Sequence, residues 1–365
     1  MAINVTRRRA LASLLATLAF PAEVFSALKT TKRDEPHLLA AWNQGDDSFA
    51  GAWSPREGAR GIRLPARAHE VCQIPRRPRE ALAISRRPGE FLLRFDFRDA
   101  RALRWHEAET DRVFSGHAAF STDGITLYTT ETNVENGDGL IGVRDPVSLE
   151  KREEWATNGI CPHALLMRSD GSLLVANGGI LTLPETGRRK LNLVEMDPSL
   201  VAIDNRGGML GQWRLPDNRL SIRHIAPTPD GRLTGLALQA EHKHEDQRRD
   251  APILALFNGD RLILAEAPSS HSLQGYGGDI AYVEYSGKRY FAVSCPRAGV
   301  IALWDTNGNY VESISAARVC ALAANNFDGD WVATSEAGMI WNLGESRKQF
   351  ESMMRWDNHA KFLML

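Results

Sequence analysis

Apolar residues along this chain occur in short runs separated by turns, and Ser115–Glu131 shows the repeating unit most clearly. It reads SGHAAFSTDGITLYTTE: a histidine, a short apolar segment, an Asp-Gly turn and a second apolar segment. Apolar runs this short, bounded by turn residues, are typical of strands. Asp-Gly is a favoured hairpin turn because glycine adopts positive φ without steric cost. The segment therefore predicts a β-hairpin introduced by a histidine.

The same order recurs down the chain, usually with a histidine at its start. The equivalent hairpins begin at His69, His163, His224, Asp279 and Val319. A third apolar strand is predicted after each hairpin, at Glu90–Asp96, Leu140–Asp145, Asn192–Asp197, Pro252–Asn258, Val300–Asp305 and Met339–Asn342. A more polar fourth strand follows in most units. Four short strands repeated at intervals of roughly 40 to 60 residues are typical of a β-propeller.

The two ends of the chain together supply a seventh unit. Three N-terminal strands lack a preceding inner strand: Leu38–Trp42, Phe49–Trp53 and Gly61–Leu64. Asn358–Leu363 is an inner strand with no partners after it. Pairing the last strand with the first closes the ring and leaves only protected edges. The prediction is an all-β, WD40/YVTN-like, seven-bladed propeller over residues 37–365. Two charge-dense insertions, Gly178–Lys190 and Ala240–Ala251, are expected to be solvated loops between second and third strands.

The N-terminal residues are interpreted as an export signal rather than as part of the fold. Thr6–Leu11 reads TRRRAL, a twin-arginine pattern, and a short, weakly apolar run follows at Ala10–Phe20. That run is too short to span a bilayer. We expect a signal peptide over residues 1–26, a linker over 27–36, and export of the folded protein to a bacterial periplasm by the twin-arginine route. The alternative is an amphipathic N-terminal helix that stays attached.

Charge and cysteine content narrow the classes of function. The 365 residues include 44 basic and 45 acidic side chains, and the net charge of −1 argues against a dedicated nucleic-acid or membrane-surface protein. The cysteines form no CxxC motif, so neither a zinc knuckle nor a redox pair is indicated. They are interpreted as buried apolar residues, with a disulfide as the alternative in an oxidising compartment: Cys72, Cys161, Cys295 and Cys320.

Propeller geometry gathers the repeated histidines on one face. In a four-stranded blade, the entrance to the inner strand and the loop between the second and third strands open at the same end of the ring. The inner-strand residues expected at that mouth of the channel are His69, His117, His163, His224, Asp279 and His359. The loop residues expected there are Glu131, Asn133, Asn177, Arg297 and Glu336. We therefore expect a polar, histidine-rich, ligand-binding funnel.

The funnel has a functional and a structural interpretation. Neutral imidazole binds Zn, Cu, Fe and Ni, so the candidate metal ligands are His117, His163 and His224, completed by Glu131, Glu336 or Asp279. An anionic small molecule is the other ligand class. Structurally, WD40-type repeats use a Gly-His pair at this corner to bond neighbouring blades, and Gly116-His117 looks the same. Seven-fold spacing is expected to let only two or three histidines, with water, reach one ion.

Other clusters carry weaker signals. Glu241–Asp246 reads EHKHED, which is either a loose metal-binding loop or a solvated one. His271 follows two serines, but no nucleophile motif supports a Ser-His pair. Most tryptophans occur at strand positions and are interpreted as packing between blades.

In its motifs the chain resembles an uncharacterised bacterial family, domain of unknown function 1513. The matching segments include SGHAAFSTDGITLYTTE, GLIGVRD, NGICPHALLMRSDGSLLVANGGI, LSIRHIAPTPDG and the closing WDNHA, and the likeness covers roughly residues 36–363. It departs from the expected pattern at Cys295–Gly299 and at Arg318–Cys320. The resemblance implies a seven-bladed propeller with a twin-arginine signal. Members of the family are encoded near periplasmic iron-associated proteins, so the resemblance also implies a role in metal acquisition.

Three functions remain open at this point. The first is a periplasmic protein that binds a small ligand or a protein partner through the funnel, with a transition metal as the candidate cofactor. The second is an enzyme, either a lactonase-like hydrolase or a metal-dependent oxidoreductase, with Glu131 or a histidine as base. The third is a purely structural protein. No nucleic-acid partner and no stable membrane insertion are expected.

Overall fold

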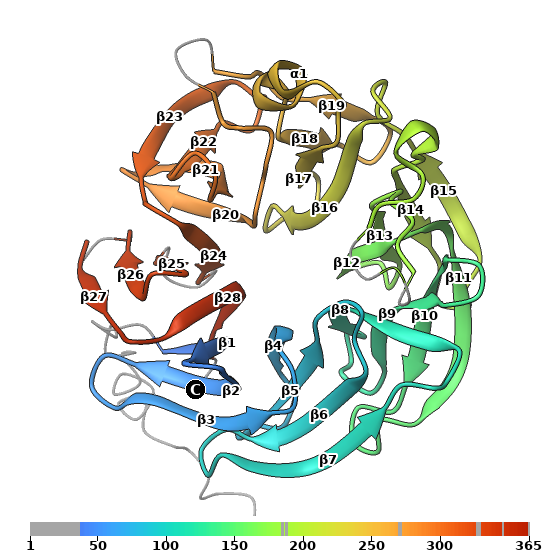
Figure 1. The fold of residues 1–365 in the computed structure, drawn as a ribbon, viewed down its shortest axis with the longest axis vertical. Helices are drawn as coiled ribbons and strands as arrows, with labels where there is room; N and C mark the ends of the chain where they lie inside the picture. The colour runs from blue at the N-terminus through green and yellow to red at the C-terminus, as the bar shows by residue number, and fades with distance from the viewer. Residues whose placement is uncertain are drawn as a thin grey trace, which may run out of the picture. The chain divides into compact units, whose positions relative to one another are not determined.

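The computed structural model describes residues 37–183, 186, 189–268, 272–325, 330–344 and 347–363. Pro36–Leu365 forms one compact unit, in which seven four-stranded antiparallel sheets are arranged as a ring (Figure 1). The prediction of an all-β, seven-bladed propeller is therefore confirmed. The expected signal peptide at 1–26 and linker at 27–36 lie outside the described residues. Within the described part of the chain, no helix is both long and apolar enough to cross a bilayer.

Each sheet is one blade, with its four strands in order from the channel outwards. Blade 1 contains β28 (Arg355–Phe362), β1 (Leu38–Gln44), β2 (Asp47–Ser54) and β3 (Gly58–Leu64). Blade 2 contains β4 (Ala68–Gln73), β5 (Glu80–Ser85), β6 (Phe91–Asp96) and β7 (Arg101–Glu107). Blade 3 contains β8 (Arg112–Phe120), β9 (Leu127–Asn133), β10 (Asp138–Arg144) and β11 (Lys151–Ile160).

The remaining four blades follow the same order. Blade 4 contains β12 (Pro162–Met167), β13 (Leu173–Asn177), β14 (Ser199–Ile203) and β15 (Met209–Trp213). Blade 5 contains β16 (Leu220–Pro227), β17 (Thr234–Ala240), β18 (Leu254–Phe257) and β19 (Leu262–Leu264). Blade 6 contains β20 (Ile280–Tyr285), β21 (Lys288–Cys295), β22 (Val300–Trp304) and β23 (Tyr310–Ser315). Blade 7 contains β24 (Val319–Ala324), β25 (Trp331–Ser335), β26 (Met339–Asn342) and β27 (Gln349–Glu351).

Burial explains why the middle strands read as unbroken apolar runs. All five residues of β13 are buried, as are all five of β25, because neighbouring blades cover both faces of each sheet. The outermost strands differ, since β7 and β11 are largely exposed or half-buried along their length. Packing between blades therefore selects apolar side chains on both faces of the second and third strands, and the hairpin pattern follows from it.

The third strand of blade 4 was predicted in the wrong place. Asn192–Asp197 forms no strand; it contains the short 3₁₀ helix η2 (Leu193–Glu195), and β14 at Ser199–Ile203 pairs with β13 instead. The apolar residues misled the prediction, because Val194 is 80% exposed whereas every residue of β14 is buried. The Asn192 side chain also bonds the insertion, accepting from the Leu181 N–H at 2.7 Å.

The two insertions contact one another. Lys190 of the first forms an ion pair with Glu241 of the second, and Glu241 is buried. The second insertion also contains the short helix α1 (Glu245–Asp250), which has no buried residue. The expectation of solvated loops therefore holds for α1, whereas the stretch around Glu241 packs against the neighbouring insertion.

The C-terminal strand closes the ring as predicted. In Figure 1 β28 lies beside β1, and their register runs from Leu38 opposite Phe362 to Asn43 opposite Arg355. Trp356 of β28 is 1% exposed, and its ring centroid lies 5.7 Å from that of Trp53. The closing strand is thus held by apolar packing as well as by the backbone ladder.

Removing this packing should destabilise the whole propeller. We expect Trp356→Ala to lower the free energy of unfolding by about 3–5 kcal/mol, because the truncated side chain leaves a cavity at the closure. Urea denaturation measures the change, with Met353→Ala as control because Met353 is 90% exposed nearby. Equal midpoints for the two variants would show that packing of the closing strand does not stabilise the ring.

Candidate metal centre

The inner-strand histidines occur where the strands depart from regular pairing. The ladder register shifts beside His69 in β4, His117 in β8, His163 in β12, His224 in β16 and His359 in β28. Such β-bulges bend the strand and re-aim a side chain. Side chains that a regular strand would send into the blade faces are here directed at the channel.

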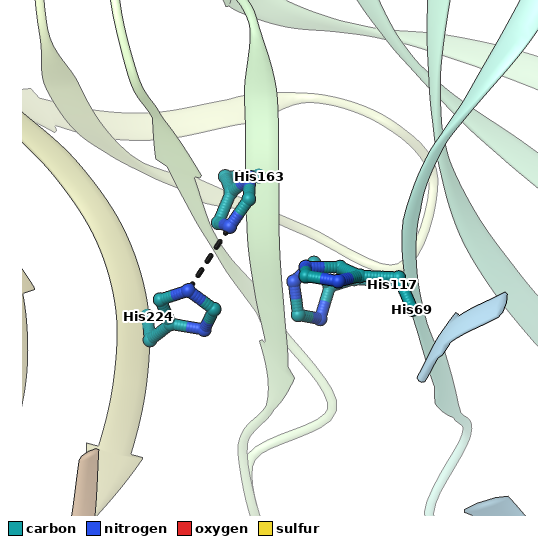
Figure 2. A group of neighbouring side chains, drawn as sticks. All are labelled: His69, His117, His163 and His224. Atoms are coloured by element: carbon teal, nitrogen blue, oxygen red, sulfur yellow. Dashed lines mark hydrogen bonds between the residues drawn. The ribbon is translucent and has the colours of Figure 1, made fainter. Parts of the chain in front are cut away.

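The imidazoles therefore converge on one another. Figure 2 shows His69, His117, His163 and His224, which come from four different inner strands, pointing into a common space. The ring centroids of His224 and His359 lie 4.5 Å apart, and those of His69 and His224 lie 6.1 Å apart. Each of the five residues is no more than 6% exposed. We call these five residues the histidine cluster.

The imidazole nitrogens lie close to one another in two overlapping groups. One nitrogen from each of His69, His117, His163 and His224 lies within 4.8 Å of the others, and a second such group joins His224 to Asp279 and His359. The Nε2 atoms of His163 and His224 lie 3.1 Å apart (Figure 2), close to the spacing of about 3.3 Å between two ligands of a tetrahedral zinc ion. The bulges bring these nitrogens together, and the expectation that two or three of them reach one ion stays a prediction.

Several nitrogens of the cluster have no hydrogen-bond partner. Within the described part of the chain this holds for both nitrogens of His69, Nε2 of His117, Nδ1 of His163 and Nε2 of His359. Buried polar atoms are normally paired, because leaving one unpaired costs about 1–3 kcal/mol. These unpaired imidazole nitrogens lie around one space, where an ion, a small ligand or ordered water can supply the missing partner.

Carboxylates stand behind the imidazoles. The Nδ1 atom of His117 lies 3.1 Å from Glu70 Oε2, and Nδ1 of His359 lies 3.3 Å from Asp279 Oδ1. Asp357 Oδ1 is 3.9 Å from Nδ1 of His69. Metal-binding histidines usually donate their second N–H to such an acceptor, which fixes the tautomer and orients the ring.

The protonation of Glu70 settles the tautomer of His117. Burial alone would raise the pKa of Glu70, but Lys361 at 3.2 Å and the hydrogen bond to His117 together hold that pKa well below its usual value. Glu70 is therefore an ionised acceptor, and His117 donates from Nδ1. The lone pair of His117 is left on Nε2, which faces the cluster.

Three further imidazoles of the cluster, those of His69, His163 and His224, are neutral because they are buried. Burial lowers the pKa of His69, His163 and His224 well below its usual value, because desolvation disfavours the charged ring. Neighbouring imidazoles lower these values further, as do Arg86 for His69 and Arg223 for His163. Burial also lowers the pKa of His117. Neutral imidazole is the form that binds a metal.

Sequence reasoning missed two members of this site, Glu70 and Asp357. Glu70 follows His69 directly, and Asp357 precedes His359 by two residues. Each carboxylate serves the histidine of another strand or blade, so the sequence around a single histidine could not reveal the pairing. The available signal for both carboxylates was an acid within two residues of a channel histidine.

The contact between His117 and Glu70 also joins blade 3 to blade 2. It resembles the structural role expected of the Gly116-His117 pair. Gly116 has φ +104°, and a Cβ added there would lie 2.7 Å from Cδ2 of His69. The glycine thus makes room for the imidazole of His69 in the neighbouring blade. The side chain of His117 both bonds blade 2 through Nδ1 and presents Nε2 to the cluster.

Glu131 lies away from the cluster, contrary to expectation. It is fully buried on β9, where Oε1 accepts from Arg144 at 2.8 Å and Oε2 pairs with Lys151 at 3.1 Å. Arg144, at the end of β10, is likewise fully buried. Burial and two cations engage this carboxylate within blade 3, so it takes no part in the channel.

The other loop residues are dispersed. Asn133 caps its own turn by accepting from the Glu135 N–H, and the Asn177 side chain donates to the Thr157 carbonyl inside the blades. Glu336 is exposed and 3.5 Å from Arg318. Arg297 alone among them lines the pocket beside the histidines. The loops between second and third strands diverge from the axis, whereas the inner strands converge on it. The loop residues are therefore separated from the histidines.

The remaining candidate groups contribute nothing to the cluster. All four cysteines are free thiols, three of them buried. Burial raises the pKa of Cys295 and of Cys320 to about 12, so these two are inert. His242 pairs with Asp217 at 2.8 Å. His271 lies outside the described residues.

The fold and site define a β-propeller with a buried histidine cluster in its channel. The model of a family described as "Protein of unknown function (DUF1513)" matches residues 62–363, and the chain belongs to that family. The resemblance seen in its motifs is thereby confirmed. A search of curated proteins found no match.

Solved structures show the same architecture. The crystal structure of Chaetomium thermophilum Raptor is similar, with a TM-score of 0.59 and 9% identity over 89% of this chain and 27% of that chain. This chain therefore spans about a quarter of the Raptor chain. Many other solved chains match as well, so the likeness identifies the fold and no activity.

Acidification should destabilise the ligand-free protein. A histidine held neutral in the folded state binds a proton near pH 6.5 once unfolded, so stability falls as pH drops below that value, by up to about 1.4 kcal/mol per pH unit for each such histidine. Urea unfolding between about pH 7 and about pH 5 measures this slope. His69→Gln should flatten this slope, because it removes one of the buried neutral imidazoles. A pH-independent free energy of unfolding over this range would contradict buried neutral imidazoles.

Substitution at Gly116 should disturb the cluster specifically. Gly116→Ala and Gly171→Ala both place a side chain at positive φ, but an added Cβ meets His69 only at Gly116, since nothing lies within 4 Å at Gly171. We expect Gly116→Ala to be less stable than Gly171→Ala by about 1–3 kcal/mol in urea denaturation. Equal losses would show that His69 is not packed against this glycine.

Proposed function

We propose that this protein is a periplasmic, metal-binding propeller that holds one divalent transition-metal ion in its histidine cluster. The observation that carries the proposal is a set of four buried imidazoles, with one nitrogen of each within 4.8 Å of the others. Three of the four, His69, His117 and His163, also have a buried nitrogen without a hydrogen-bond partner. The four proposed ligands are His69, His117, His163 and His224. His359 and Asp279 form an adjoining group that shares His224.

The donor set favours certain metals. Imidazole nitrogen suits Zn²⁺, Cu²⁺, Ni²⁺ and Fe²⁺, whereas Mg²⁺ and Ca²⁺ require oxygen ligands. Affinity within the first group generally rises towards Cu²⁺. Carboxylates behind His117, His359 and His69 would strengthen binding through the acceptor role described above. An ion that replaces the hydrogen bond between His163 and His224 would also supply a partner for Nε2 of His117 and for one nitrogen of His69.

The site favours binding over hydrolysis. A hydrolase that uses Glu131 as its base receives no support, because Arg144 and Lys151 engage that carboxylate away from the channel. Three of the proposed ligands line an open pocket, so an ion can enter from solvent. A capture or carrier role suits a periplasmic protein whose family resemblance points towards metal acquisition.

Metal titration tests the proposal. We expect the metal-free protein to bind about one equivalent of Zn²⁺ or Ni²⁺, and His117→Ala/His163→Ala to bind at least 100-fold more weakly in isothermal titration. His242→Ala is the matched control, because that histidine lies outside the cluster. If the double variant unfolds, His163→Gln alone replaces it, since removing one ligand must still weaken binding. Equal affinity in wild type and variant would overturn the proposal.

Export is tested separately. Replacing Arg7 and Arg8 by Lys should retain the protein in the cytoplasm, because the twin-arginine pair is the address that the export route reads. Fractionation and immunoblotting measure the distribution, with Arg9→Lys as the matched control. Unchanged periplasmic recovery of the double variant would contradict this route.

A further inference from the structure

A second binding pocket adjoins the histidine cluster. It is a cavity of about 250 Å³, bordered by His69, His163 and His224 on the cluster side and by the insertion of blade 4 and the segment Tyr276–Gly277 on the other. Its lining includes five cationic side chains: Arg86, Arg87, Lys190, Arg223 and Arg297. Among the described residues that line it there is no Asp or Glu. We call this cavity the arginine pocket.

Two of the five cations already contact acids. Arg86 lies 3.8 Å from Asp357, and Lys190 pairs with Glu241. These two therefore contribute little uncompensated charge to the pocket.

The other three cations have no carboxylate partner in the described part of the chain. Arg87 and Arg223 both donate to the sulfur of Cys161, the latter at 3.6 Å. The guanidinium carbon of Arg297 lies 4.5 Å from the centre of the Tyr276 ring. A single thiol cannot neutralise two guanidinium groups, even though they lower the pKa of Cys161 against the effect of its burial. Positive charge is thus left over at two positions, beside Cys161 and above Tyr276.

Leaving this charge uncompensated is costly. The Arg223 side chain is half-buried, and desolvation lowers its pKa, an effect that Cys161 opposes and Arg87 increases. A buried cation without an anionic partner is among the most destabilising features of a fold. Arginine pairs best with carboxylates, which its planar group can grip through two parallel hydrogen bonds.

The cations also oppose the charge on a metal ion in the neighbouring cluster. Arg223 lines the same cavity as His163 and His224, so its positive charge disfavours a further cation there. An anion in the arginine pocket would lie between the guanidinium groups and the imidazoles. It would offset both sources of positive charge at once.

We propose that the arginine pocket binds a small organic anion with two or three carboxylates. Two separated positions of uncompensated charge match carboxylates at the two ends of a molecule better than they match one compact phosphate. The cavity lies just below the usual range for ligand sites of about 300–1,000 Å³, which restricts the ligand to metabolite size. Side chains of Gln239 and Asn358 also line it and can bond a hydroxyl of such a ligand.

Citrate titration of the metal-free protein tests this site independently of the metal. We expect saturable binding of about one citrate per chain in isothermal titration at low ionic strength, where screening is weak. Arg223→Gln and Arg297→Gln should each weaken binding at least tenfold. Arg232→Gln is the matched control, because the Arg232 side chain is 89% exposed and lies outside the pocket. Inorganic phosphate, titrated in parallel, should bind at least tenfold more weakly than citrate.

Each outcome decides the proposal. If Arg223→Gln fails to fold, Arg297→Gln still decides, because Arg297 is exposed at the rim. No saturable citrate binding, equal binding of phosphate, or citrate binding unchanged in Arg297→Gln would each overturn it. Because metal is absent from this titration, a failure here leaves the metal proposal standing, and a failure of metal binding leaves this one standing.

Discussion

The structure depends on bringing five imidazoles into one buried space at the axis of the ring. Inner strands of a propeller leave a channel that must be filled or solvated, and here bulged strands direct histidines into it. The ring must be closed for these strands to face one another, which ties the pairing of β28 with β1 to the site. Glu70 and Asp279 then hold individual rings from outside the cluster. Fold and candidate site therefore rest on the same inner strands.

Sequence alone predicted the architecture because the repeat is a packing requirement. Each blade needs two apolar middle strands and a tight turn, and that requirement recurs at similar spacing in every unit. The exception in blade 4 is informative: Asn192–Asp197 and Ser199–Ile203 are both apolar enough for a strand, and only packing against the neighbouring sheets distinguishes them. The closing strand was equally predictable, since an inner strand without partners had to find them.

The sequence predicted the histidines of the site but not the carboxylates that contact them. Position in the repeat identified all five channel histidines, but the distance between them depends on bulges that leave no clear mark in the residues themselves. Glu131 was assigned to the mouth because it ends a strand, yet Arg144 on the adjacent strand captures it. Glu70 and Asp357 were missed because each acts across strands or blades. The arginine pocket was missed for the same reason, because its cations come from distant parts of the chain.

The central claim is that imidazole nitrogens of the histidine cluster coordinate one metal ion. X-ray absorption spectroscopy of the protein loaded with one equivalent of Zn²⁺ tests it most directly. The account predicts nitrogen neighbours at about 2.0–2.1 Å, with the outer scattering that imidazole rings produce. A sulfur neighbour at about 2.3 Å would instead assign the ion to a thiol such as Cys161. That result, or a shell of oxygen atoms without imidazole scattering, would contradict the account.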